Sequence, residues 1–345
     1  MPSLVSVVVA NWNGRAHLEK CFTSIAAQTY PAVEIILVDN GSTDGSAAWA
    51  AEHFPEARVI ANPRNLGFAA ANNQGIRVGR GEYFALLNND AWVEPDWVAA
   101  LVTAVERQPR VGMAASQMVF ADQPEIINST GICVDRCGLT WDRQGGQAAQ
   151  PAAGQPRYVF GPSAGAALYR RELFADVGLF DEDFFAYLED VDLAWRARWR
   201  GWEALYVPAA RVYHHHSATT REGSPFKTYL LSRNKLQLLA KNYPWPDGLL
   251  YLPLMLFYET LSLGFAVSGR RGTSAFRGRL AGLAALPGAW RKRRQFLSRP
   301  HVPVRQVFRL LEAAAWPWQV YGRYRHLAAR SEPNTRPTPP AGDDA

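Results

Sequence analysis

Two polar clusters, about one hundred residues apart, contain the side chains best suited to chemistry. The first is Asn88-Asn89-Asp90, directly after an apolar run, and the second is Glu189-Asp190, at the start of a stretch with helical spacing. A carboxylate such as Asp90 suits Mg²⁺, which takes one or two carboxylates and completes its shell with phosphate oxygens and water. A carboxylate such as Asp190 can accept a proton from a hydroxyl group within hydrogen-bond distance. In a purely structural role, both acids of the second cluster would be favoured by the dipole of their helix.

Alternating strands and helices are predicted for the first ninety residues, which lead up to the first cluster. Apolar, β-branched runs typical of strands buried on both faces occupy 4–11, 33–41, 57–62 and 83–90. Segments with helical spacing lie between them, at 17–28, 45–54 and 69–79. This order predicts a parallel sheet with helices on both faces. Ligands of such sheets bind beyond the carboxyl ends of the strands.

Asparagine or aspartate follows each of the four predicted strands. These residues are Asn11 and Asn13, Asp39 and Asn40, Asn62 and Asn65, and Asn88 to Asp90. One such group alone would indicate only a turn, because Asn and Asp are common turn residues. Four in succession, at strand ends that a parallel sheet brings to one edge, predict a binding site for a polar ligand.

The phosphate-binding glycine motifs are absent from the sequence. The loop after the first strand, "ANWNGRAHL", has the single glycine Gly14, so it is not the G-x-G-x-x-G of a dinucleotide site, and no G-x-x-x-x-G-K-[ST] occurs. Phosphate charge would therefore be met by a divalent cation held by oxygen ligands, and Asp90 is well placed for that role.

The composition is that of a folded protein from a reducing compartment. Of the 345 residues, 48% are apolar and 20% are charged, so general disorder is not expected. The three cysteines, Cys21, Cys133 and Cys137, are too few and odd in number for a disulfide framework. The pair Cys133 and Cys137 lacks the second ligand pair that a structural zinc site needs. The short apolar N-terminus predicts a first strand and not a signal peptide.

Charge is distributed very unevenly along the chain. The net charge is −7 over residues 1–225, +15 over 226–330 and −2 over the last fifteen residues. An acidic body joined to a basic segment predicts a domain attached to an anionic surface, either nucleic acid or membrane.

Five motifs in order, "VVVANWNG", "VDNGSTDGS", "NPRNLGFAAANNQG", "LLNNDAWVEPDW" and "FFAYLEDVDLAWRARWRGW", resemble glycosyltransferase family 2 and, within it, the bacterial rhamnosyltransferase-like enzymes. The resemblance covers roughly residues 3–240. It implies a GT-A fold, Rossmann-like with a mostly parallel sheet, and a nucleotide-diphosphate sugar donor. It also implies a Mg²⁺ or Mn²⁺ ion and inversion at the anomeric carbon.

The resemblance implies a nucleotide-sugar site at the strand ends. Its residues would be Ala10, Asn11, Asn13, Asp39, Asn65, Gly67, Asn72, Asn88, Asn89 and Gly165. Asp39 matches the acid that accepts a hydrogen bond from the pyrimidine, and Gly67 would let the backbone approach the nucleotide closely. Asn88-Asn89-Asp90 stands where the family has its D-x-D motif, so an amide replaces the first carboxylate here.

The resemblance also implies the metal ligands and the base. Asp90 would bind the metal, and His214 matches a histidine that completes the metal shell, with His215 and His216 as its neighbours in the loop. Asp190, preceded by Glu189, matches the catalytic base of the family's E-D pair. The next acid along the helix, Asp192, is expected instead to form a structural pair with Arg196, four residues later.

The basic C-terminal segment favours a membrane surface over nucleic acid. The apolar stretch 248–267, interrupted by Pro253 and Glu259, predicts a helix in the membrane interface or a shallow re-entrant hairpin and not a span. Arginine and lysine beside Trp and Phe in 268–283 and 289–297 suit anionic lipid headgroups. No known nucleic-acid motif accompanies them, so no nucleic-acid partner is expected.

The sequence therefore predicts a GT-A domain over 1–225, a basic amphipathic helical region that associates with membrane over 226–330, and a disordered tail over 331–345. The expected activity is inverting, metal-dependent transfer of a rhamnose-like or other hexose in cell-surface polysaccharide synthesis. The donor would be a dTDP-rhamnose-like or UDP-sugar, and the acceptor a polyprenyl-linked glycan. The enzyme would be peripheral on the cytoplasmic face of the inner membrane. Two alternatives stay open, a catalytically inactive sugar-nucleotide scaffold and a sugar nucleotidyltransferase.

Overall fold

A computed structural model describes residues 2–149, 151, 153–215, 224–245, 247–299, 302–316 and 318–319 of the chain. Its first part has the alternation that the sequence predicts. The strands are β1 (Val5–Asn11), β2 (Val33–Asp39), β3 (Arg58–Ala61) and β4 (Tyr83–Asn88). The helices between them are α1 (Arg15–Ala26), α2 (Ser46–His53) and α3 (Phe68–Val78). β1 pairs in parallel with β2 and β4, and β2 with β3, so the carboxyl ends of all four strands meet at one edge.

The second half of the sheet is mixed. Its strands are β5 (Ala91–Val93), β6 (Val111–Phe120), β7 (Gln123–Ser129), β10 (Arg157–Val159), β11 (Ala166–Arg170) and β12 (Glu203–His214). The order across the sheet is β10-β12-β6-β11-β4-β1-β2-β3, with β5 also on β12 and β7 on β6. β11 is antiparallel to both of its neighbours, β4 and β6, and so joins the two halves.

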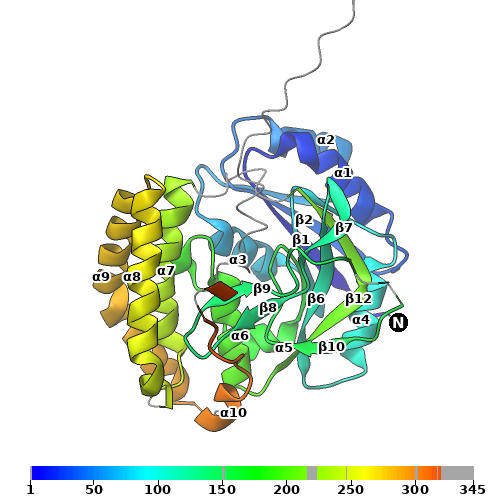
Figure 1. The fold of residues 1–345 in the computed structure, drawn as a ribbon. Helices are drawn as coiled ribbons and strands as arrows, with labels where there is room; N and C mark the ends of the chain where they lie inside the picture. The colour runs from blue at the N-terminus through cyan, green and yellow to red at the C-terminus, as the bar shows by residue number, and fades with distance from the viewer. Residues whose placement is uncertain are drawn as a thin grey trace, which may run out of the picture.

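Helices on both faces of this sheet enclose two apolar cores (Figure 1). Side chains alternate along the strand, so Val8 points into one core and Val7 and Val9 into the other. The first core includes α3, α5 (Arg171–Val177) and α6 (Glu189–Trp199), and the second includes α1, α2 and α4 (Trp97–Glu106). The predicted α/β architecture, with strands buried on both faces, is confirmed.

The segment between β6 and β11 contains more structure than the sequence indicated. Besides β7 and β10 it forms a small antiparallel pair, β8 (Ile132–Val134) with β9 (Thr140–Asp142). These strands have three to seven residues each, too few for a clear alternation of apolar and polar positions.

A separate layer of helices stands beside the α/β domain (Figure 1). It consists of α7 (Pro225–Asn242), the 3₁₀ segment η2 (Asp247–Tyr251), α8 (Leu252–Ser268), α9 (Gly272–Leu297) and the short α10 (Val304–Phe308). A second 3₁₀ segment, η1 (Glu182–Phe184), lies in the α/β domain before α6. Figure 1 shows α7, α8 and α9 side by side, with α9 packed along α7.

The apolar stretch 248–267 is one continuous helical segment, so the expectation of a re-entrant hairpin is wrong. Pro253 lies in the first turn of α8. Backbone N–H groups in a first turn have no acceptor within the helix, so a proline there costs no helical hydrogen bond. Glu259 is neutralised by ion pairs with Lys235 on α7 and Arg279 on α9. By length and composition, Gly248–Ser268 is also long and apolar enough to cross a membrane, contrary to the expectation from its Pro and Glu. The tail 331–345 lies outside the described residues.

Candidate active site

The ends of β1, β2 and β4 bring several of the predicted polar side chains together. Strand register sets Asn11 opposite Asp39 and Ala10 opposite Asn88. The Asn11 amide donates to Asp39 Oδ1 over 2.8 Å, and Asn11 Oδ1 accepts from Asn89 Nδ2 over 2.7 Å. The three bonded side chains are buried, so each one fixes the orientation of the next along this edge.

The loops after β1 and β2 are also tied to each other. Asp39 Oδ2 accepts from the Ser42 backbone amide over 3.0 Å, so this acid caps the turn after β2. Asn13, with a φ of +50°, accepts from the Thr43 amide through its side-chain oxygen over 2.8 Å. Each carboxylate oxygen of Asp39 has capacity for a second hydrogen bond. The geometry therefore leaves Asp39 able to meet a ligand while it caps the turn.

The end of β3 forms its own amide cluster. Asn40 Nδ2 donates to Asn65 Oδ1 over 2.9 Å, and Asn65 Oδ1 also accepts from the Gly67 amide. Gly67 has a φ of +94°, and a Cβ atom there would lie 2.6 Å from the Phe185 carbonyl oxygen. Packing alone explains this glycine, so its role beside a nucleotide stays a prediction. Asn72 is buried in α3 and donates to a carbonyl one turn earlier.

Asp90 and His214, the two predicted metal ligands, lie next to each other and are buried. His214 is the last residue of β12, and its Nε2 lies 3.2 Å from Asp90 Oδ1 and 3.2 Å from Asn88 Nδ2. Its other nitrogen, Nδ1, lies 2.8 Å from Asn128 Oδ1. An amide oxygen only accepts, so Nδ1 carries a proton, and Nε2 faces both the Asp90 carboxylate and the Asn88 side-chain amide.

The Asp90 carboxylate has the properties of a hard-cation ligand. Burial alone would raise its pKa, but His214 and His17 outweigh burial and hold the pKa below its usual value. Its Oδ1 atom is buried and makes no hydrogen bond within the described part of the chain. No group of three or more His, Cys, Asp or Glu that could hold a metal occurs among those residues. Two protein ligands fit Mg²⁺ or Mn²⁺ when phosphate oxygens complete the shell.

Asp190 lies at the start of α6 with its carboxylate held by backbone groups. Its Oδ2 accepts from the Ala164 amide over 3.0 Å, and its Oδ1 accepts from the Val191 amide over 2.8 Å. Burial raises the pKa of Asp190 to about 6, the negative charge of Asp142 adds to the rise, and the two amide bonds oppose it. A carboxylate with this pKa is ionised at neutral pH and is a stronger base than an ordinary aspartate.

Glu189 and Tyr169 are the buried neighbours of this acid. Glu189 Oε2 and the Tyr169 hydroxyl are both buried without a hydrogen-bond partner among the residues that the structure describes. Burial and the charge of Asp190 raise the pKa of Glu189 well above its usual value. Burial, Asp190 and Glu189 raise that of Tyr169 in the same way. Asp190, whose carboxylate is held by two amide hydrogen bonds, is therefore the acid of the pair better suited to act as a base.

A dipeptide from the loop before β11 connects the two clusters. The backbone amide of Asn88 donates to the Gly165 carbonyl over 2.8 Å. Ala164, which precedes Gly165, donates its backbone amide to Asp190 Oδ2. A Cβ atom on Gly165 would lie 3.2 Å from Asn88 Nδ2, so a larger residue would crowd the first cluster. The chain of contacts from Asp90 through His214, Asn88 and this dipeptide to Asp190 brings both clusters to one site.

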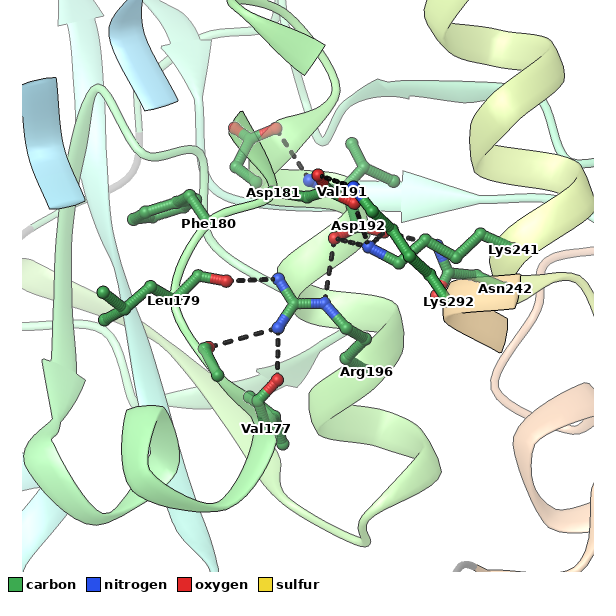
Figure 2. A network of polar contacts seen from close by, with 12 residues as sticks. Val177, Leu179, Phe180, Asp181, Val191, Asp192, Arg196, Lys241, Asn242 and Lys292 are labelled. Carbon is green, nitrogen blue, oxygen red and sulfur yellow. Dashed lines mark hydrogen bonds and ion pairs between the residues drawn. The ribbon is translucent and has the colours of Figure 1, made fainter. Parts of the chain in front are cut away.

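Asp192 belongs to a buried charge network and not to the site, as expected (Figure 2). It accepts from Arg196 Nε over 2.9 Å, which confirms the predicted pair one helical turn apart. It also accepts from Lys241 Nζ and Asn242 Nδ2, both on α7. The network therefore fixes α6 to the helical layer.

The remaining histidines have different positions. The His215 amide donates to the Asp90 carbonyl over 3.0 Å, and its ring lies against His17 and Trp92. His216 lies outside the described residues. Sequence reasoning did not single out Asn128, because an asparagine inside a strand that pairs with β6 carries no local signal. The contact with His214 appears only in the folded chain.

Comparison with solved structures defines the class of protein. GalNAc-T7 with UDP, GalNAc and Mn²⁺ is similar with a TM-score of 0.56 and 18% identity, over 69% of this chain and 48% of that one. The mannosyltransferase PcManGT from Pyrobaculum calidifontis, with GDP-Man and Mn²⁺, has a TM-score of 0.52 and 19% identity over 86% of both chains. The fold is that of the GT-A glycosyltransferases.

Sequence comparison gives the family. Residues 6–178, half of the chain, match the family described as glycosyl transferase family 2. The N-acetylglucosaminyl-diphospho-decaprenol L-rhamnosyltransferase of Mycobacterium tuberculosis is 31% identical over 243 residues, which are 64% of this chain and 78% of that protein. The chain belongs to glycosyltransferase family 2, is a glycosyltransferase, and resembles the rhamnosyltransferases within the family.

Proposed function

We propose that this glycosyltransferase is an inverting, metal-dependent enzyme that transfers a rhamnose-like or other hexose from a nucleotide-diphosphate sugar to a polyprenyl-linked glycan. The observation that carries the proposal is the connection of Asp90 and His214 with Asp190 at one edge of the sheet. A group that suits a cation and a carboxylate with a raised pKa then stand on the same site. Transfer between a diphosphate and a hydroxyl needs both.

In this proposal, the residues at the strand ends bind and orient the donor. Asp90 and His214 hold Mg²⁺ or Mn²⁺, which when bound neutralises the charge of the departing diphosphate. The nucleotide and sugar contact the edge built by Ala10, Asn11, Asn13, Asp39, Asn65, Gly67, Asn72, Asn88, Asn89 and Gly165. Asp39 accepts a hydrogen bond from the base with the capacity that its turn bonds leave free.

Asp190 acts as the base in the proposed reaction. It removes the proton from the acceptor hydroxyl as that oxygen attacks the anomeric carbon from the side opposite the diphosphate. The amide hydrogen bonds from Ala164 and Val191 fix the direction of the carboxylate. Burial and the charge of Asp190 raise the pKa of Glu189 beside it, which favours the uncharged form of Glu189.

The acceptor and the location are proposed from the relative and from the helical layer. The mycobacterial relative is named for a substrate that carries N-acetylglucosamine on diphospho-decaprenol. A substrate of this kind is held in a membrane by its lipid. Leu250 of η2 is 82% exposed, Phe265 of α8 is 62% exposed, and other apolar residues of α8 and α9 are also open to solvent. We therefore place the enzyme as a peripheral protein on the anionic cytoplasmic face of the inner membrane.

A panel of nucleotide sugars tests the function. With Mn²⁺ and an N-acetylglucosaminyl-diphospho-lipid acceptor, at least one of the dTDP-, UDP- and GDP-sugars should release its nucleoside diphosphate and extend the acceptor. Asp190→Asn should slow extension roughly 10²- to 10⁴-fold and retain donor binding, because the donor contacts other residues. Release of pyrophosphate from a nucleoside triphosphate would identify a nucleotidyltransferase instead. Donor binding without turnover, unchanged in Asp190→Asn, would identify an inactive scaffold.

A further inference from the structure

The four residues before the Glu189-Asp190 pair have an unusual backbone. Phe185, Tyr187 and Leu188 have φ values of +63°, +69° and +69°. None is glycine, and bulky side chains seldom adopt positive φ. Residues in such conformations persist only where the surrounding structure holds them, and they concentrate at functional sites. The segment that carries Asp190 into the site must therefore be held by something outside itself.

The group that holds it is the side chain of Asn234, on α7. Asn234 is fully buried, and its Nδ2 lies within 2.9 Å of the carbonyl oxygens of Phe184, Ala186 and Tyr187. Arg233 Nε donates to Asn234 Oδ1 over 2.8 Å, which directs the amide nitrogen at the three carbonyls. One side chain thus contacts backbone carbonyls in and next to the left-handed segment, and Arg233 Nη2 adds a bond to the Phe184 carbonyl.

Other contacts hold the same start of α6 from the helical layer (Figure 2). Lys241 Nζ, on α7, lies 2.6 Å from Asp181 and 2.8 Å from Asp192, and Lys292, on α9, lies 2.5 Å from Asp181. Asp181 precedes the strained segment and Asp192 follows it. The segment is therefore anchored at both ends as well as in the middle.

We propose that Asn234 is a positioning residue for Asp190, and that helix α7 thereby completes the active site of the α/β domain. The inference rests on the proposed function, in which Asp190 is the base. The physical step is a displacement: without the two N–H groups that Asn234 shares among these three carbonyls, the segment leaves its left-handed conformation. The start of α6 then moves away from the Ala164 amide that fixes the carboxylate.

Two variants of the full chain test this role against a control of equal burial. Asn234→Ala removes the donor, and Asn234→Asp replaces it with an oxygen that repels the carbonyls. Leu101→Ala, in the other core, destabilises the protein at a site remote from α6. We expect kcat to fall roughly 100-fold in both Asn234 variants, because a displacement of about 1 Å can cost that much. The dissociation constant of the nucleotide sugar should change less than about twofold, and Leu101→Ala should keep the wild-type kcat.

Two readouts separate positioning from general stability. Amide hydrogen exchange of a peptide covering 184–192 should accelerate in the Asn234 variants and stay unchanged in Leu101→Ala. The acidic limb of the pH profile should move to higher pH, because the Ala164 amide bond lowers the pKa of Asp190. Unchanged exchange and an unchanged limb in the Asn234 variants would overturn the inference.

The exchange measurement keeps the inference independent of the proposed function. If the wild-type enzyme transfers no sugar, the proposed function fails, and exchange in 184–192 still decides whether Asn234 holds the segment. If neither Asn234 variant folds, Arg233→Lys takes their place, because it weakens the bond that orients the Asn234 amide and the two Arg233 bonds to the Asp183 and Phe184 carbonyls. This milder variant should shift the exchange, kcat and pH limb in the same direction, and wild-type values in all three would contradict the inference.

Discussion

The pKa of Asp190 is set by the burial of its carboxyl group and by hydrogen bonds from two backbone amides. Burial and the nearby charge of Asp142 push its pKa up, and the amides of Ala164 and Val191 push it down, with a result of about 6. Glu189, its neighbour in the chain, accepts no hydrogen bond on Oε2 within the described residues, and burial and the charge of Asp190 raise its pKa well above the usual value. Two adjacent acids of the same helix thereby stand in different hydrogen-bond environments.

The pH dependence of the reaction should report this difference. The base form of Asp190 is lost as the pH falls through about 6, so kcat/KM should fall about tenfold per pH unit below that value. Asp190→Asn should lower kcat by roughly 10²- to 10⁴-fold and remove the limb. Asp183→Asn, which changes an acid whose side chain is 63% exposed, should leave kcat and the acidic limb of the pH profile unchanged. An acidic limb near pH 4, typical of an exposed aspartate, would contradict the assignment.

Metal affinity should depend on Asp90 and respond to the amide at position 88. Asp90→Asn removes the ionised ligand, so the dissociation constant for Mn²⁺ should rise at least about tenfold, measured by calorimetry with a nucleoside diphosphate present. Asn88→Asp adds the carboxylate that the family carries there and should tighten Mn²⁺ binding. Asp96→Asn, at an exposed acid of the next loop, serves as the control. Equal Mn²⁺ affinity in wild type and Asp90→Asn would exclude Asp90 as a ligand.

At this scale the sequence reveals residue types but not their partners. Asp90, His214 and Asp190 stand out because acids and histidines at strand ends and helix starts match a family pattern. Asn128 and Asn234 have no such pattern. Asn128 contacts a residue 86 positions away in the chain, and Asn234 contacts residues 47 to 50 positions away. An asparagine in a strand or in the middle of a helix has many uses, and only the fold distinguishes them.

At the scale of elements, strands buried on both faces were the most predictable part of the structure. β1, β2 and β4 are continuous apolar runs, and helices of ordinary spacing separate them, so order and pairing followed directly. The short strands β8, β9 and β10 were not predictable, because three residues give no periodicity. Pro253 was misread as a break, because the start of α8 could not be located from composition alone.

The charge network between α6, α7 and α9 should contribute strongly to stability (Figure 2). Lys241→Met leaves Asp181 and Asp192 buried without that partner, so unfolding should become easier by about 3–5 kcal/mol at pH 7. The measurement is urea unfolding. Lys235→Met, at a more exposed lysine of the same helix, is the control and should cost about 1 kcal/mol or less.

The same comparison has a defined pH dependence. Burial alone would raise the pKa of Asp181, but Lys241 and Lys292 outweigh it and hold the pKa well below the usual value. A depressed pKa stabilises the fold above the unfolded value of about 3.9, and that contribution disappears as the pH falls. The difference between wild type and Lys241→Met should therefore be largest at neutral pH and shrink below about pH 4. A difference independent of pH would mean that lost packing, not charge, causes the effect.

At the scale of the whole molecule, the helical layer has two faces with different chemistry. Its inner face holds the start of α6 through Asn234 and Lys241. Its outer face exposes apolar side chains of α8 and α9, and the region 226–330 has a net charge of +15. The charge asymmetry along the chain predicted an anionic partner, but composition could not reveal that the same helices also contact the catalytic half.

A peripheral protein with this outer face should bind anionic vesicles in a salt-dependent manner. Each basic side chain near such a surface contributes about 1 kcal/mol, so Arg270→Gln with Arg277→Gln should weaken binding about 30-fold at low salt. Leu256→Ser with Phe265→Ser should weaken it at low and high salt alike, because apolar burial is not screened. Tyr158→Ser, at a residue 61% exposed on β10, is the matched control.

Vesicle co-sedimentation also distinguishes a surface-bound helix from a membrane span. Gly248–Ser268 is long and apolar enough to cross, but Glu259 is paired with Lys235 on α7 and Arg279 on α9. A crossing would separate α8 from the ion partner on α7, and an unpaired carboxylate in hydrocarbon is costly. Binding should therefore weaken as the salt concentration rises, and a protease added outside the vesicles should digest 248–268. Binding that does not respond to salt, with this segment protected from the protease, would show that α8 leaves its partners and inserts.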